Sequence, residues 1–290
     1  MIKALFITIL SSMLLLGFLE EAYGKDYARL LVKGLIKLEY PLDSMDVIAL
    51  DKISMRFDAR NRFDVLKKIL GDRDKIHNSK KGEYYEKVDV ICNALRLLDE
   101  LDLPRTSEIV GELISEQGWE KREAMLLSYM SAKRDMDYEA NKKYLIESLL
   151  RQGLEEEWNG NISSAIMDTC DNISFLSDLY IYKGDKEILD ALISYAAHAY
   201  GYPAEHLSRK FAEMFIKRPQ LFINVLSEKN AQKTGLVIES LVFGIWDGKV
   251  RGEVDEILEI KLSDKDYSDN WVVGLLRDRL ENRLKNASSR

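Results

Sequence analysis

Histidine, the side chain that titrates nearest neutral pH and commonly binds metals, occurs three times in this chain. His198 and His206, with Glu205, could supply the two imidazoles and one carboxylate of a zinc or iron site. The segment Gly201–Pro203 interrupts the helical pattern between the two histidines, so the spacing does not place them on one helix face. The sequence favours two partly buried polar side chains, and we predict no metal and no cofactor.

Tyrosine is unevenly distributed, and five of the 14 lie between positions 180 and 202: Tyr180, Tyr182, Tyr195, Tyr200 and Tyr202. A tyrosine ring offers a rigid apolar face with a polar tip, which suits stacking on sugars or covering peptide backbone. Four of the five flank predicted turns, whereas Tyr195 falls in the middle of a predicted helix and is expected in the core. We therefore expect a ligand-binding surface formed by Tyr180, Tyr182, Tyr200, Tyr202 and His206. The alternative is that these rings pack at the ends of two helices.

Motifs for covalent or phosphate chemistry are absent, since the sequence has no C-x-x-C, H-E-x-x-H, G-x-S-x-G or Walker-type glycine loop. Paired carboxylates could hydrolyse a glycoside, with one as acid and one as base or nucleophile. The candidates are Glu155–Glu157 beside Trp158, and Asp168 with Asp171. An acidic chain offers many neighbouring carboxylates by chance, and the run at Glu155–Glu157 is more typical of a solvated helix end.

The charge balance excludes some partner classes. Asp plus Glu is 49 and Lys plus Arg is 42, a net charge of −7, whereas a broad nucleic-acid surface needs a basic excess. Apolar residues make up 46% and charged residues 31% of the chain, which is typical of a packed globular protein. We therefore expect a folded protein with no nucleic-acid partner.

The N-terminal end has the features of an export signal, and residues 1–24 are predicted to be a signal peptide. A positive residue precedes the uncharged stretch Ala4–Leu19, which is shorter than the roughly 20 residues that span a bilayer as a helix. Ala22 and Gly24 are the small residues of a cleavage site, so we expect cleavage before Lys25. The mature chain would be periplasmic or extracellular, with no transmembrane segment. The alternative is an uncleaved membrane anchor.

Apolar residues recur at helical spacing through most of the mature chain, which predicts an all-α fold. The predicted helices cover residues 26–39, 83–101, 105–117, 161–182 and 185–200, with a last helix around 275–284. Pro104, Pro203 and Pro219 each begin an amphipathic run, where a missing N–H costs nothing. Asp185 is placed to cap a first turn. Residues 47–57 alternate in polarity and could form a short strand instead.

The predicted helices pair into hairpins. Residues 103–134 and 185–226 each contain two amphipathic helices joined by a turn, a unit of about 40 residues. In period and apolar spacing these hairpins resemble HEAT-like or armadillo-like α-solenoid repeats, and the chain is similar to uncharacterised secreted bacterial helical proteins. The resemblance implies stacked hairpins that bury a continuous core. No linker interrupts the chain, so residues 25–290 are expected to form a single helical-repeat domain. The alternative is an irregular all-α bundle.

Cys92 and Cys170 are the only thiols. An exported protein can form disulfides, but these two cysteines lie almost two predicted repeats apart. Helix layers about 8–10 Å apart would separate them by about 20 Å, whereas a disulfide needs Cα atoms within roughly 7 Å. We therefore predict that the two cysteines are buried and not bonded to each other.

The function expected from these features is binding. A stack of helical hairpins offers an extended surface without catalytic residues, so we expect an exported scaffold that engages a protein or peptide partner. The alternative is a cell-envelope glycan hydrolase with an all-α fold. Two carboxyl groups facing each other across a cleft at about 5–10 Å would favour the hydrolase.

Overall fold

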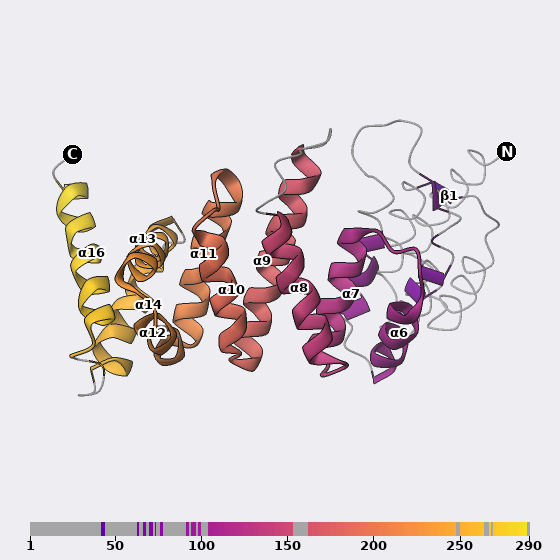
Figure 1. Ribbon diagram of the computed structural model, residues 1–290, viewed down its shortest axis with the longest axis horizontal. Coiled ribbons are helices and arrows are strands. Elements are labelled where there is room, and N and C mark those ends of the chain that lie inside the picture. Colours follow the sequence, from indigo (N-terminus) through magenta and orange to yellow (C-terminus); the bar gives the residue numbers. More distant parts are fainter. Residues whose placement is uncertain are drawn as a thin grey trace, which may run out of the picture. The chain divides into compact units, whose positions relative to one another are not determined.

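The computed structural model describes the following parts of the chain: residues 104–152, 162–247, 250–263, 267 and 269–288, with scattered positions between 42 and 99 (Figure 1). By its internal contacts the chain divides into two compact units, residues 1–126 and 127–290. The predicted signal peptide at 1–24 and the possible strand at 47–57 lie outside the described residues. The single domain over residues 25–290 stays a prediction.

Helices dominate the described residues, which confirms the predicted all-α class. The elements in chain order are β1 (Leu42–Asp43), β2 (Ile76–His77), α6 (Pro104–Ser115), α7 (Lys121–Lys133), α8 (Tyr138–Gln152), α9 (Ile162–Lys183), α10 (Lys186–Ala196), α11 (Gly201–Lys217), α12 (Pro219–Ser227), α13 (Ala231–Asp247), α14 (Arg251–Glu256), the π-helix η2 (Ile257–Lys261) and α16 (Trp271–Ser288). The two short strands form one parallel pair in which Leu42 lies opposite Ile76. The sequence pattern did not predict this pair.

Local sequence explains where several helices begin. Pro104 and Pro219 are the first residues of α6 and α12, where the missing N–H leaves no broken bond. Asp185 caps α10 as predicted, because its Oδ1 accepts a hydrogen bond from the Glu187 N–H at 2.9 Å. The preceding Gly184 has a φ of +72°, a left-handed conformation that glycine adopts without strain.

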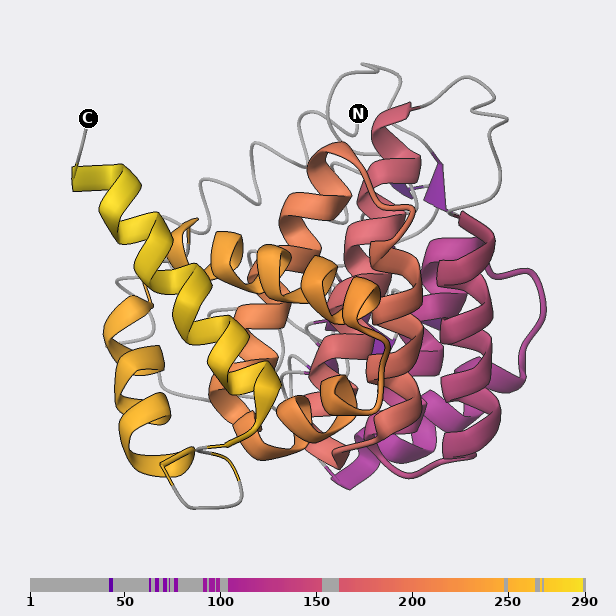
Figure 2. The same cartoon turned by 60° about the vertical axis from the view of Figure 1, so that its left-hand side comes forward.

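In unit 2, α9 and α11 pack side by side and run parallel (Figure 2). Ser174 in α9 bonds His206 in the first half of α11. Arg218, directly after α11, donates to the carbonyls of Ile181 and Tyr182 at the end of α9, over 2.5 and 2.8 Å. Both helices therefore begin at the same end of the unit, and α10 carries the chain back between them.

A buried lysine joins α8 to α10. The Lys142 side chain is 5% exposed, and its Nζ lies 2.7 Å from Glu139, 2.9 Å from Asp185 and 2.8 Å from Glu187. The Tyr138 hydroxyl donates to the Asp185 carboxylate at 3.0 Å. Burial lowers the pKa of Lys142, but the bonds to its three carboxylates outweigh burial and raise that pKa above its usual value. Lys142 is therefore held in its charged form.

Helices α11 and α13 make a very close crossing. A Cβ atom placed on Gly244 of α13 would lie 2.0 Å from the Ser208 carbonyl oxygen and 2.5 Å from its carbon, both backbone atoms of α11. Beside this crossing, Phe222 of α12 meets Phe211 and Phe215 of α11 edge-to-face, with ring centroids 6.0 and 5.9 Å apart. The contacts of α11 with α12 and α13 therefore form part of the core of unit 2.

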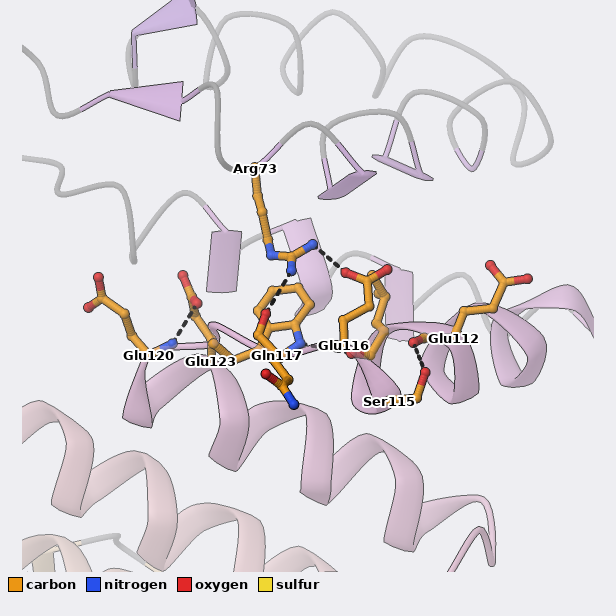
Figure 3. Close-up of polar contacts among 9 residues, drawn as sticks. Arg73, Glu112, Ser115, Glu116, Gln117, Glu120 and Glu123 are labelled. Carbon is orange, nitrogen blue, oxygen red and sulfur yellow. Dashed lines mark hydrogen bonds and ion pairs between the residues drawn. The ribbon is translucent and has the colours of Figure 1, made fainter.

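Unit 1 contains a buried arginine against the turn between α6 and α7 (Figure 3). The Arg73 guanidinium lies 3.9 Å from the centre of the Trp119 ring, donates to Glu116 Oε2 at 2.5 Å and donates to the Gln117 carbonyl at 3.3 Å. The Trp119 indole N–H in turn donates to the Leu113 carbonyl at 2.7 Å. This set of contacts holds the segment around Arg73 on the α6–α7 turn.

Candidate functional site

The structure places the tyrosines of the predicted binding surface in different environments. Tyr180 is completely buried, whereas Tyr182, Tyr200 and Tyr202 are 62%, 69% and 50% exposed. The expectation that Tyr180 reaches solvent is therefore wrong. Tyr180 continues the apolar stripe of α9, seven residues after the buried Ile173, and this helical spacing was available in the sequence. Tyr195 is buried, as predicted.

Tyr182 lies apart from the other two exposed tyrosines. Tyr182 precedes α10, whereas Tyr200 and Tyr202 follow α10, so Tyr182 and the other two tyrosines lie at opposite ends of that helix. A helix of the length of α10 rises about 16 Å at 1.5 Å per residue. The structure therefore brings together Tyr202 and His206, with Tyr200 two residues before Tyr202 at the start of α11, and leaves Tyr182 beside Arg218 at the other end of α9.

We call Tyr200, Tyr202, Glu205, His206 and Ser174 the Tyr202 surface. The Tyr202 and His206 rings stack with centroids 6.5 Å apart and an interplanar angle of 25°. Ser174 Oγ and His206 Nε2 are hydrogen-bonded at 2.8 Å. Tyr200 directly precedes α11, the first half of α11 supplies Tyr202, Glu205 and His206, and α9 supplies the serine that fixes the imidazole.

His206 is neutral in this environment at pH 7. Burial lowers its pKa below the usual value, and the positive charges of Lys210 and Arg209 lower it further. Asp171 and Glu213 act in the opposite direction without reversing the shift. A neutral imidazole can exchange a hydrogen bond with Ser174 and stack on Tyr202 without adding charge to the surface.

An ion pair supports the hydroxyl end of Tyr202. Arg209 donates through Nε to Asp247 at the end of α13. The pKa of Arg209 is raised by its bond to Asp247 first, and the neighbouring Tyr202 adds to that shift. Tyr202 is therefore bounded by His206 on its ring face and by Arg209 near its hydroxyl.

A second charged group lies further along the same two helices. Lys210 Nζ is 2.7 Å from Glu213 and 3.9 Å from Asp178 of α9. Burial raises the pKa of Asp178, against the opposing effect of Lys210. On the α7 side, the Tyr129 ring stacks on Phe175 with centroids 4.8 Å apart. The two cations that follow His206 are thus both engaged by carboxylates.

The Ser174–His206 pair has the spacing of a nucleophile and its base. Both residues lie inside helices, where backbone N–H groups are bonded to carbonyls four residues earlier. The first turn of α11, which has no side-chain cap, is the exception, because its N–H groups have no partner within the helix. The sequence analysis missed Ser174, because its contact depends on the alignment of two helices distant in the chain.

Of the two carboxylate candidates for glycoside hydrolysis, one lies in the described part of the chain. Glu155–Glu157 and Trp158 lie outside it, whereas Asp168 and Asp171 are three residues apart on α9. His198 is exposed in the turn before α11. Within the described ranges, no three His, Cys, Asp or Glu side chains are grouped so as to hold a metal ion.

The two cysteines do not form a disulfide, and both are buried, as predicted. Burial, followed by the charge of Asp171, raises the pKa of Cys170 to about 11. The Cys170 thiol therefore stays protonated at neutral pH and is a poor nucleophile.

Among the helices that the structure describes, none combines the length and apolar composition required to cross a membrane. Comparisons with protein families, with curated proteins and with solved structures found no match for this chain.

Tyr180→Phe is expected to leave the fold unchanged or to stabilise it by up to about 1 kcal/mol. The Tyr180 hydroxyl is buried, and no hydrogen-bond partner lies within reach among the described residues. Leaving such a group unsatisfied costs about 1–3 kcal/mol, so its removal relieves a penalty. Urea unfolding measures the effect, with the exposed Tyr182→Phe as control. A loss above about 1 kcal/mol for Tyr180→Phe alone would show that the hydroxyl has a partner.

Proposed function

We propose that this protein is an exported helical scaffold that binds a protein or peptide partner through the Tyr202 surface. The observation that carries the proposal is the exposure of Tyr200 and Tyr202, 69% and 50%, next to an imidazole fixed by Ser174. Large aromatic side chains contribute much of the binding energy at protein interfaces, and these two reach solvent at one end of a helix.

The Tyr202 ring is held in place before any partner arrives. His206 stacks on it, and the Arg209–Asp247 pair lies near its hydroxyl. A side chain that is already ordered loses little conformational entropy on binding, so more of its contact energy is available for affinity. Tyrosine has few rotatable bonds, which reduces that loss further.

A HEAT-like stack is the arrangement that we propose for the helices. Within unit 2, α9, α11 and α13 contact one another in succession, and so do α8, α10 and α12. Alternate helices in two layers are what stacked hairpins require. The apolar N-terminal segment with its small-residue cleavage pattern supports export of the scaffold.

The double variant Tyr200→Ala, Tyr202→Ala is expected to weaken partner binding by about 1–3 kcal/mol, the range for aromatic hot spots. The melting temperature should stay within a few degrees of the parent, because both rings are at least half exposed. Tyr182→Ala is the matched control, since it removes an equally exposed ring at the far end of α9.

The measurement is quantitative mass spectrometry of cell-envelope proteins captured on the parent chain and on the two variants. Captured proteins should be lost with the double variant and retained with Tyr182→Ala. Equal capture by all three proteins would refute the proposed surface. A double variant that unfolds would instead assign these tyrosines to packing.

A further inference from the structure

Negative side chains surround the exposed rings of the Tyr202 surface. Glu205 follows Tyr202 by three residues on α11, and side chains three apart on a helix are neighbours. Asp171 and Glu213 lie close enough to His206 to oppose the lowering of its pKa. Of these carboxylates, Glu205 is the one whose place on α11 puts it beside the exposed Tyr202.

The cations near the same surface are already neutralised. Arg209 is paired with Asp247, and Lys210 with Glu213 and Asp178. A third cation, Lys133, also acts on Asp178. Among the residues that the structure describes, no lysine or arginine forms an ion pair with Glu205.

We propose that the Tyr202 surface takes a lysine or arginine side chain of the partner, held between the exposed tyrosine rings and the Glu205 carboxylate. This inference rests on the proposed function and specifies its partner as a basic peptide segment. The binding residues assigned to the cation are Tyr200, Tyr202 and Glu205.

The chemistry of the surface fits a cation better than an anion. The face of a tyrosine ring attracts an ammonium or guanidinium group within about 6 Å of its centre. The Glu205 carboxylate accepts charge-assisted hydrogen bonds from the same group. A neutral His206 behind Tyr202 adds no opposing charge. At longer range, the net charge of −7 favours the approach of a basic segment over an acidic one.

A binding experiment with defined peptides tests the inference. The probe is a short fluorescein-labelled peptide of alternating Lys and Gly, titrated with the full chain and followed by fluorescence anisotropy. Peptides with Glu or Ser in place of Lys are the comparison. We expect the lysine peptide to bind at least about fivefold more tightly than either, with affinity falling as salt rises.

Variants separate a specific site from general attraction to an acidic protein. Glu205→Gln should weaken binding of the lysine peptide about fivefold, whereas Glu281→Gln, an exposed glutamate of α16 with the same charge change, should leave it unchanged. Tyr202→Phe keeps the aromatic face and should bind more tightly than Tyr202→Leu. Tyr202→Leu keeps apolar area without that face and should bind about fivefold more weakly.

Two results would overturn the inference: equal loss in Glu205→Gln and Glu281→Gln, or parent-like binding by Tyr202→Leu. Either result would leave the proposed function in place, provided that the Tyr200→Ala, Tyr202→Ala variant still fails to capture the partner that the parent chain captures. Failure of that capture experiment would refute the proposed function itself. The two ideas therefore fail on different measurements.

Discussion

Gly244→Ala is expected to destabilise the protein by about 3 kcal/mol, at the upper end of the range for overpacked interiors. The added methyl group would lie 2.0 Å from the Ser208 carbonyl oxygen, a distance that no side-chain rotation can relieve because the obstacle is backbone. Helices α11 and α13 would have to separate, which also pulls Asp247 away from Arg209. Thermal unfolding should show a fall of about 6–12 °C for a domain of this size.

The same helix supplies the control. Gly235 is an interior residue of α13, and a Cβ atom there meets nothing within 4 Å. Gly235→Ala should therefore raise the stability by up to about 1 kcal/mol through better helix propensity alone. If both variants shift the melting temperature in the same direction, the close approach of α11 and α13 is not a determinant of stability.

Lys142→Met is expected to destabilise the protein by about 3 kcal/mol, because it leaves the Asp185 carboxylate, which is only 20% exposed, without its cation. Methionine keeps much of the apolar stem, so the loss reports mainly on charge. The neighbouring Lys143 is 75% exposed and lies 3.9 Å from Glu147, and Lys143→Met should change the stability by less than about 0.5 kcal/mol.

The loss in Lys142→Met should depend on pH. Burial raises the pKa of Asp185, but hydrogen bonds from Lys142, the Glu187 N–H and Tyr138 outweigh it and leave that pKa lowered. A lowered carboxyl pKa stabilises the fold above the unfolded value of about 3.9, and this contribution disappears as pH falls through the folded value. Urea unfolding at pH 7 and pH 3 should show a smaller difference between parent and variant at pH 3, because the loss of this contribution begins below about pH 3.9. An equal difference at both would assign the effect to packing.

The helices could be predicted from the sequence because their information is local. The spacing of Ile173, Leu176 and Leu179 marks one face of α9, and Asp185 marks the start of α10 through its capping side chain. The pair of short strands could not be predicted, since two-residue segments carry no periodic pattern.

The candidate site was predictable only in part. Composition drew attention to Tyr200, Tyr202 and His206, and the structure stacks the Tyr202 and His206 rings on each other. Composition wrongly grouped Tyr182 with these residues. Tyr182 and Tyr200 are close in sequence, but helix α10 lies between them and separates their side chains in space. The partner of His206 was hidden for a related reason: Ser174 becomes its neighbour only once α9 and α11 align in parallel.

The turn that holds Gly184 links two positions far apart in the chain. A Cβ atom on Gly184 would come within 3.0 Å of the Arg218 Nη1, and Arg218 is the side chain that binds the last carbonyls of α9. A larger residue at position 184 would push the guanidinium off those carbonyls, besides straining the left-handed backbone. The two positions are therefore expected to covary during evolution: a side chain at 184 requires both a residue that tolerates the left-handed backbone, such as asparagine, and the loss of the arginine at 218.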